Sequence, residues 1–188
     1  MIETASTDDL DFSHAFDAPA KALPSLKASS EKEKQEVTAG ADKLQASGYL
    51  VNIARKAKRV APLASRFSIL CIEDDPGLLG VLAKKLTLDG YAVRTASDRQ
   101  TILAELQRLP PPHLILLDVG LPGISGFDIL QKLRQHPKLG SIPVIMLTAH
   151  SSPEDVLRGL KGGAEGYVSK PFQFDALTAA IETVLGLR

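Results

Sequence analysis

Five short strand-like runs, each followed by a helical period, are the feature of this chain that most restricts its fold. The runs lie at Phe67–Ile72, Tyr91–Ala96, His113–Leu117, Val144–Leu147 and Gly166–Ser169. After each run, apolar residues recur every three or four positions, which is the period of an amphipathic helix. Five strands alternating with five helices predict an α/β fold in which a doubly wound parallel sheet carries helices on both faces.

Local signals agree with this division into strands and helices. Pro76 occupies a position where a first-turn proline is tolerated, Asp98 lies where a helix needs an N-cap, and Gly90 comes just after a helix end. Leu114–Leu117 and Val144–Leu147 are continuously apolar, as expected of central strands that are buried on both faces. In such sheets ligands bind beyond the carboxyl ends of the strands, so we expect the functional site at that edge.

The chain before residue 67 has a different character. Residues 1–30 are rich in Ser, Ala, Asp and Pro without a sustained period, which predicts a disordered tail. Residues 31–66 are expected to form an accessory helix (Glu31–Ala46), a short strand at Tyr49–Ile53 and a basic linker. One helix and one strand cannot bury a core of their own, so this segment must pack on something else or remain partly disordered.

Bulk composition excludes several classes of function. The formal net charge is zero, so nothing global indicates a nucleic acid or an acidic membrane as partner. The N-terminus lacks a secretory signal and the apolar runs are too short to cross a bilayer, which favours a cytoplasmic protein without a membrane partner. The single cysteine, Cys71, lies in an apolar run and is expected to be a small buried hydrophobe.

Polar residues follow the first, third, fourth and fifth strand-like runs: Glu73-Asp74-Asp75, Asp118, Thr148 and Lys170. The predicted topology brings these strand ends together in one shallow acidic pocket. Crowded carboxylates repel one another and must either take up protons or recruit a cation. Oxygen ligands with room for water suit Mg²⁺. Each residue alone has a plainer explanation, such as a helix cap at Asp75, but their joint placement at successive strand ends favours a site.

Four of these stretches resemble the receiver domain of two-component response regulators. They are Ile69–Pro76, Leu116–Gly123, Pro143–Ala149 and Gly163–Phe172, they occur in family order, and the resemblance covers residues 67–188. It implies a flavodoxin-like sheet with strand order 2-1-3-4-5, preceded here by an N-terminal extension. It also implies a signalling module that catalyses only its own phosphoryl transfer and hydrolysis, rather than an enzyme with a separate substrate.

Carried over by position, the resemblance implies that Asp118 is phosphorylated. Asp74 would be a direct Mg²⁺ ligand together with Asp118, Glu73 would act mainly through water, and the backbone carbonyl of Gly120 would complete the protein ligands. A carboxylate attacks an anionic phosphoryl donor poorly because like charges meet, so catalysis amounts to positioning and charge stabilisation.

Three further residues receive roles from the same resemblance. Lys170 would pair with the phosphoryl oxygens, Thr148 would donate a hydrogen bond to one of them, and Tyr167 occupies the aromatic switch position. A cis peptide is implied between Lys170 and Pro171. Thr148 would move toward the phosphoryl group and Tyr167 would fill the vacated space, which biases the fourth helix together with the fifth strand and helix.

Glycines and a histidine near the site leave more than one interpretation open. Gly159 lies inside the fourth predicted helix, and an interior glycine costs about 1 kcal/mol relative to alanine, which predicts an easily moved helix. Gly162-Gly163 could equally be a C-cap. Gly120 and His150 are expected to tune the phosphoryl lifetime, although an exposed loop histidine is more often a bystander.

The partners expected from the resemblance are a sensor histidine kinase or a histidine phosphotransfer protein, an unknown downstream protein, and a phosphorylation-dependent homodimer. No output domain is recognised after Lys170. An alternative is a transcriptional regulator that reads DNA with residues 1–66, although only one convincing helix is found there. A nucleotide-binding enzyme would want a glycine-rich loop after the first strand, where this chain has Glu73-Asp74-Asp75.

Overall fold

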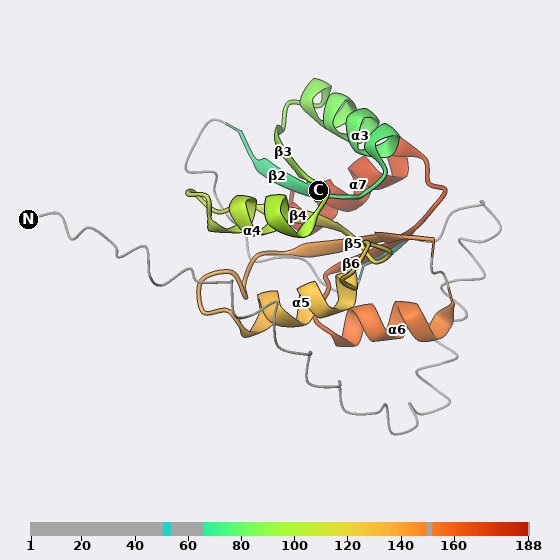
Figure 1. Ribbon diagram of the computed structural model, residues 1–188. Coiled ribbons are helices and arrows are strands. Elements are labelled where there is room, and N and C mark those ends of the chain that lie inside the picture. Colours follow the sequence, from blue (N-terminus) through green and yellow to red (C-terminus); the bar gives the residue numbers. More distant parts are fainter. Residues whose placement is uncertain (1–50, 54–65, 150–151, 188) are drawn as a thin grey trace, which may run out of the picture.

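The computed structural model describes residues 51–53, 66–149 and 152–187 (Figure 1). In this part of the chain six strands form one sheet: β1 (Val51–Ile53), β2 (Ser68–Ile72), β3 (Ala92–Ala96), β4 (Leu114–Asp118), β5 (Val144–Thr148) and β6 (Gly166–Ser169). The helices are α3 (Pro76–Leu88), α4 (Arg99–Gln107), α5 (Gly126–Gln135), α6 (Pro153–Lys161) and α7 (Phe174–Leu185). All five predicted strands and all five predicted helices of the C-terminal part are therefore confirmed.

The strands lie in the order β1-β6-β5-β4-β2-β3. Strands β2 to β6 are parallel to one another, and numbered along the chain they have the predicted order 2-1-3-4-5. The predicted strand at Tyr49–Ile53 is confirmed over Val51–Ile53, and it pairs antiparallel with β6. The sheet therefore has one strand more than the five predicted, because the outer edge of β6 offers unpaired backbone groups to which β1 adds.

Helices cover both faces of the sheet, as the doubly wound pattern predicts. Figure 1 shows α3 and α7 on one side and α5 and α6 on the other. The central strand β4 alternates between the two cores: Ile115 and Leu117 belong to the cluster with α4, α5 and α6, whereas Leu114 and Leu116 belong to the cluster with α3 and α7. Because both faces of β4 and β5 are buried, their sequences are apolar throughout.

The predicted helix boundaries are confirmed by the caps. Asp75 is the N-cap of α3, where its Oδ1 accepts a hydrogen bond from the Leu78 amide at 2.6 Å and Pro76 opens the helix. Asp98 caps α4 in the same way. Gly90 follows α3 with a φ of +93°, a left-handed conformation that glycine adopts without a steric penalty.

Several predictions fall on residues outside the described part of the chain. These are the tail at 1–30, the accessory helix at 31–46, the basic linker and His150, and they stay predictions. Among the described residues, no helix has the length and apolar character needed to cross a membrane.

The buried position of Cys71 on β2 gives a chemical prediction. The residue is fully buried, and burial above all, with a smaller effect of the Glu73 charge, raises the pKa of its thiol to about 12. The raised pKa keeps the thiol protonated, and its burial keeps it away from reagents in solvent. We expect the native thiol to react with an aromatic disulfide reagent at least about a hundredfold more slowly than the denatured chain. Equal rates in the two states would contradict the buried position of β2.

Candidate functional site

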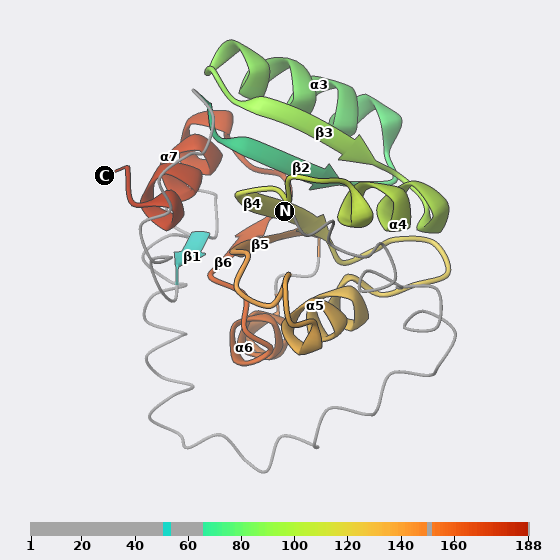
Figure 2. The same ribbon diagram turned by 90° about the vertical axis from the view of Figure 1, so that its left-hand side faces the viewer.

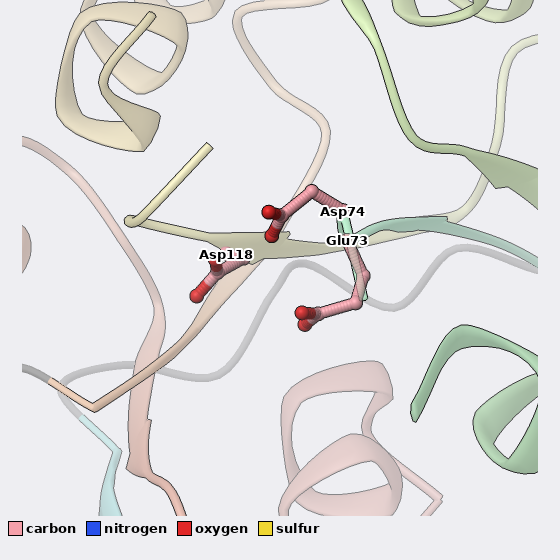
Figure 3. Close-up of side chains that lie close together, drawn as sticks. All are labelled: Glu73, Asp74 and Asp118. Carbon is pink, nitrogen blue, oxygen red and sulfur yellow. The ribbon is translucent and has the colours of Figure 1, made fainter. Parts of the chain in front are cut away.

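The three carboxylates predicted to cluster lie together at the carboxyl ends of β2 and β4. Glu73 and Asp74 follow β2, and Asp118 is the last residue of β4, the strand next to it. One oxygen of each side chain lies within 4.8 Å of the others (Figure 3). Glu73 and Asp118 are buried whereas Asp74 is exposed, so the cluster extends from the protein interior to the surface. Such crowding favours a cation.

Lys170 brings a positive charge to this cluster from the end of β6, which is separated from β4 by one strand, β5. It follows β6, and its Nζ lies 2.7 Å from Oε2 of Glu73 and 3.0 Å from Oδ1 of Asp118. Burial acts to lower the pKa of Lys170, but its hydrogen bonds to Glu73 and Asp118 outweigh this effect, so the pKa is raised. Lys170 therefore remains an ammonium ion at neutral pH and joins two buried carboxylates.

Burial of Glu73 disfavours the charged form of its carboxyl group. Desolvation raises the pKa of its carboxyl, the hydrogen bond and charge of Lys170 lower it, and the charge of Asp118 raises it again, with a net rise. The resemblance had assigned Lys170 to phosphoryl oxygens alone, so its direct ion pair with Glu73 is a contact that the sequence analysis missed. No local pattern could have revealed it, because the two residues are 97 positions apart.

The Asp118 carboxylate is held from two sides. Its Oδ1 faces Lys170, and its Oδ2 accepts a hydrogen bond from the Gly120 amide at 3.0 Å. Behind it, a Cβ on Gly126 would lie 2.1 Å from the Asp118 carbonyl oxygen, so only glycine lets α5 begin so close to β4. Gly126 is a second feature that the sequence analysis missed, although a glycine in the first turn of a predicted helix is a visible signal.

Asp75, the remaining member of the acidic run, serves the helix rather than the cluster. Its side chain caps α3, and its amide donates a hydrogen bond to Oε1 of Glu73 at 3.4 Å. The run therefore divides into two carboxylates in the cluster and one at the cap, as the sequence analysis had distinguished them.

Thr148 and Tyr167 lie on the neighbouring strands β5 and β6, diagonally across the register, because Tyr167 is opposite Met146 and Thr148 is opposite Ser169. Both are fully buried, and their side chains are hydrogen-bonded to each other. Burial, more than the nearby carboxylates, raises the pKa of the Tyr167 phenol, which is therefore a neutral hydroxyl across the physiological range. The Tyr167 ring thus lies inward, beneath α6.

Gly159 of α6 makes room for this ring. A Cβ at Gly159 would lie 2.9 Å from Cδ2 and 3.0 Å from Cε2 of Tyr167. The sequence analysis interpreted this glycine as a source of helix mobility, and the structure provides a steric reason for it. The helix is also fixed to α5, because the guanidinium of Arg158 lies 4.3 Å from the centre of the Phe127 ring.

An apolar pocket of about 440 Å³ opens beside Lys170. It is lined by Leu78, Ala149, Lys170, Pro171, Phe172 and Phe174. Phe172 and Phe174 meet edge to face at 5.7 Å, and the peptide bond before Pro171 is cis, as the resemblance implied. The pocket places an apolar surface next to the charged cluster.

Comparison with known proteins identifies this arrangement. Residues 69–182 match the family described as response regulator receiver domain. The chain belongs to this family. Its receiver domain is a signalling module and not a conventional enzyme, and its acidic triad is typical of the Mg²⁺ site of receivers.

Individual relatives agree with this assignment. The receiver domain is 43% identical over 118 residues to transcriptional regulatory protein AfsQ1 of Streptomyces coelicolor, covering 63% of this chain and 51% of that protein. It is 37% identical over 120 residues to the DNA-binding dual master transcriptional regulator RpaA of Synechocystis sp., covering 62% and 48%. The chain thus spans about half the length of these curated relatives. The structure of Vibrio cholerae chemotaxis protein CheY4 aligns with a TM-score of 0.60 and 30% identity, over 64% of this chain and all of CheY4.

The contact between Gly159 and Tyr167 predicts opposite effects for two glycine substitutions. Alanine normally stabilises a helix interior by about 0.5–1 kcal/mol relative to glycine. Gly159→Ala adds a Cβ against a buried ring, and overpacking costs about 1–3 kcal/mol, so we expect net destabilisation. Gly80→Ala in α3 is the matched control, because a Cβ there meets nothing within 4 Å and should stabilise. Urea unfolding followed by circular dichroism measures both. Equal stabilisation by the two substitutions would mean that the Tyr167 ring moves away from the added Cβ at no energetic cost, which would contradict the prediction.

Proposed function

We propose that the chain is the phospho-acceptor of a histidine-to-aspartate phosphorelay and that Asp118 accepts the phosphoryl group. The observation that carries this proposal is the position of the Asp118 carboxylate, which is held by the Lys170 ammonium and the Gly120 amide at the edge shared with two further carboxylates. One carboxylate oxygen attacks the phosphorus of a phosphohistidine, the phosphorus–nitrogen bond breaks, and an acyl phosphate forms. Water later hydrolyses the acyl phosphate and restores the carboxylate.

The same cluster fits a magnesium ion. Glu73, Asp74 and Asp118 supply carboxylate oxygens, the Gly120 carbonyl would add a fourth ligand, and the exposure of Asp74 leaves room for water. Following the resemblance, Asp74 and Asp118 would bind directly and Glu73 through water. A bound Mg²⁺ would supply charge neutralisation for the incoming phosphoryl group. Lys170 would add its own charge by exchanging a carboxylate contact for a phosphoryl oxygen.

The hydrogen bond between Thr148 and Tyr167 supports a switch at these residues. A threonine hydroxyl has one donor and two acceptor sites, so Thr148 can accept from the Tyr167 phenol while it donates to a phosphoryl oxygen. The phosphoryl group would then fix Tyr167 in its inward position beneath α6. We infer that the surface formed by α6, β6 and α7 transmits the phosphorylation state to a downstream protein or a second copy of the chain.

The pocket beside Lys170 supports a docking site for the phosphodonor. Its lining is almost wholly apolar, and Val81 on the neighbouring helix α3 is 51% exposed. A sensor histidine kinase or a histidine phosphotransfer protein that docks there would bring its phosphohistidine next to the carboxylate cluster. The alternative of DNA reading by residues 1–66 stays a prediction, because residues 1–50 and 54–65 lie outside the described part of the chain.

Phosphorylation by a small donor tests the acceptor directly. With Mg²⁺ and acetyl phosphate, we expect the wild-type chain to gain one phosphoryl group, measured by intact mass, and Asp118→Asn to gain none. Lys170→Ala should label at least about tenfold more slowly, because the variant lacks the positive charge that would stabilise the phosphoryl oxygens. Asp89→Asn, at the opposite end of α3, removes a carboxylate far from the cluster and should label normally. Normal labelling of Asp118→Asn would refute the proposal.

Metal binding can be tested without any phosphoryl transfer. Mn²⁺ is an oxygen-seeking substitute for Mg²⁺, and its free concentration is measured by electron paramagnetic resonance. We expect Asp74→Ala to weaken Mn²⁺ binding at least about tenfold, because a charged oxygen ligand is lost. Asp75→Ala is the control: it should destabilise the fold by about 1 kcal/mol through loss of the α3 cap and leave Mn²⁺ binding nearly unchanged. Equal losses of binding in both variants would place the metal elsewhere.

A further inference from the structure

The outer edge of β6 is covered by a strand from outside the matched receiver residues. Strand β1 lies at the edge of the sheet next to β6 (Figure 2). The two strands pair in antiparallel register, with Val51 opposite Val168, Asn52 opposite Tyr167 and Ile53 opposite Gly166. An uncovered edge strand presents a row of free N–H and C=O groups that readily pair with another chain. In this chain β1 takes that place, so the edge of the strand that carries Tyr167 is closed.

The connection between β1 and the rest of the sheet is long enough for β1 to leave. Residues 54–67 link it to β2, which gives 14 residues. Strands β6, β5 and β4 lie between β1 and β2, so the lateral separation is about 19 Å at about 4.8 Å per strand. Fourteen extended residues can span about 46 Å. Detachment of β1 therefore requires no movement of the five parallel strands.

The contacts of β1 are few for a member of the sheet. It is three residues long and lies on one edge, where it also contacts α7. Ile53 is 37% exposed, and its partner Gly166 has no side chain to pack against it. With three residues and one paired edge, β1 has fewer cross-strand pairs than the parallel strands of four or five residues, so it is held less firmly than they hold one another. We therefore expect β1 to open before the parallel strands do.

We propose that β1 is a removable intramolecular cover of the β6 edge, and that the uncovered edge binds the β6 edge of a second copy of this chain. The antiparallel direction of β1 shows that this edge accepts an antiparallel neighbour. A second β6 placed there in antiparallel orientation is related to the first by a two-fold axis, which gives a closed, symmetric dimer. The proposal concerns the N-terminal cover and does not depend on phosphorylation of Asp118.

Proline substitutions in β1 test the cover in the full-length chain. Val51→Pro/Ile53→Pro removes two backbone donors and disfavours pairing, while Val51→Thr/Ile53→Thr keeps both donors and the β-branched shape. We expect the wild type and the threonine variant to sediment as monomers with protected amides at residues 166–168. The proline variant should show a mean mass that rises with concentration toward that of a dimer, and its β6 amides should exchange faster on dilution.

Other outcomes would overturn the proposal. A proline variant that stays monomeric with exposed β6 amides would show that the open edge binds no second copy. A proline variant that stays monomeric with protected amides would show that β1 is not the cover. A wild-type chain that already dimerises through β6 would show that β1 does not close the edge. Circular dichroism distinguishes all these results from misfolding, because the prolines lie outside the parallel sheet and should leave the helix signal unchanged.

Discussion

The interaction on which the site depends is the pairing of one ammonium ion with two buried carboxylates. Lys170 contacts Glu73 and Asp118 within 3.0 Å, and both acids are almost completely buried. A buried charge without a partner costs several kcal/mol, so the contacts with Lys170 offset the burial of both carboxylates. The pairing in turn requires the parallel order of β2, β4, β5 and β6, because only that order points the ends of all four strands to one edge. The strand order therefore makes the ion pairs possible, and the ion pairs in turn make the burial of Glu73 and Asp118 at the strand ends tolerable.

Close approach of backbone to backbone completes the site. Gly126 allows α5 to begin against the carbonyl of Asp118, and the Gly120 amide fixes one oxygen of its side chain. With Lys170 on the other oxygen, the carboxylate is held on both sides. Such preorganisation is what the proposed phosphoryl transfer would require, because that chemistry consists largely of positioning and charge stabilisation. The small residues around Asp118 are thus part of the site although they carry no charge.

The sequence predicted the parallel fold and the gathering of the carboxylates and Lys170 at one edge of the sheet for a physical reason. Periodicity marks strands and helices, parallel topology places their ends, and the residues at those ends are polar. The ion pair between Lys170 and Glu73, and the contact between Gly159 and Tyr167, were not predictable in this way. They depend on side-chain conformations and on distances between helix and strand, which no local pattern contains. The pairing of β1 was missed for another reason: three residues are too few to show an alternating pattern that would indicate the neighbouring strand.

Strand β6 joins the site to the edge that β1 covers. Lys170 follows it, Tyr167 lies on it, and Asn52 of β1 is opposite Tyr167 in the register. Tyr167 is also the ring that Gly159 of α6 accommodates, so β6 contacts α6 through this ring and β1 along its outer edge. Loss of β1 would therefore uncover the edge of the strand that carries Tyr167 and precedes Lys170, without removing any residue of the carboxylate cluster.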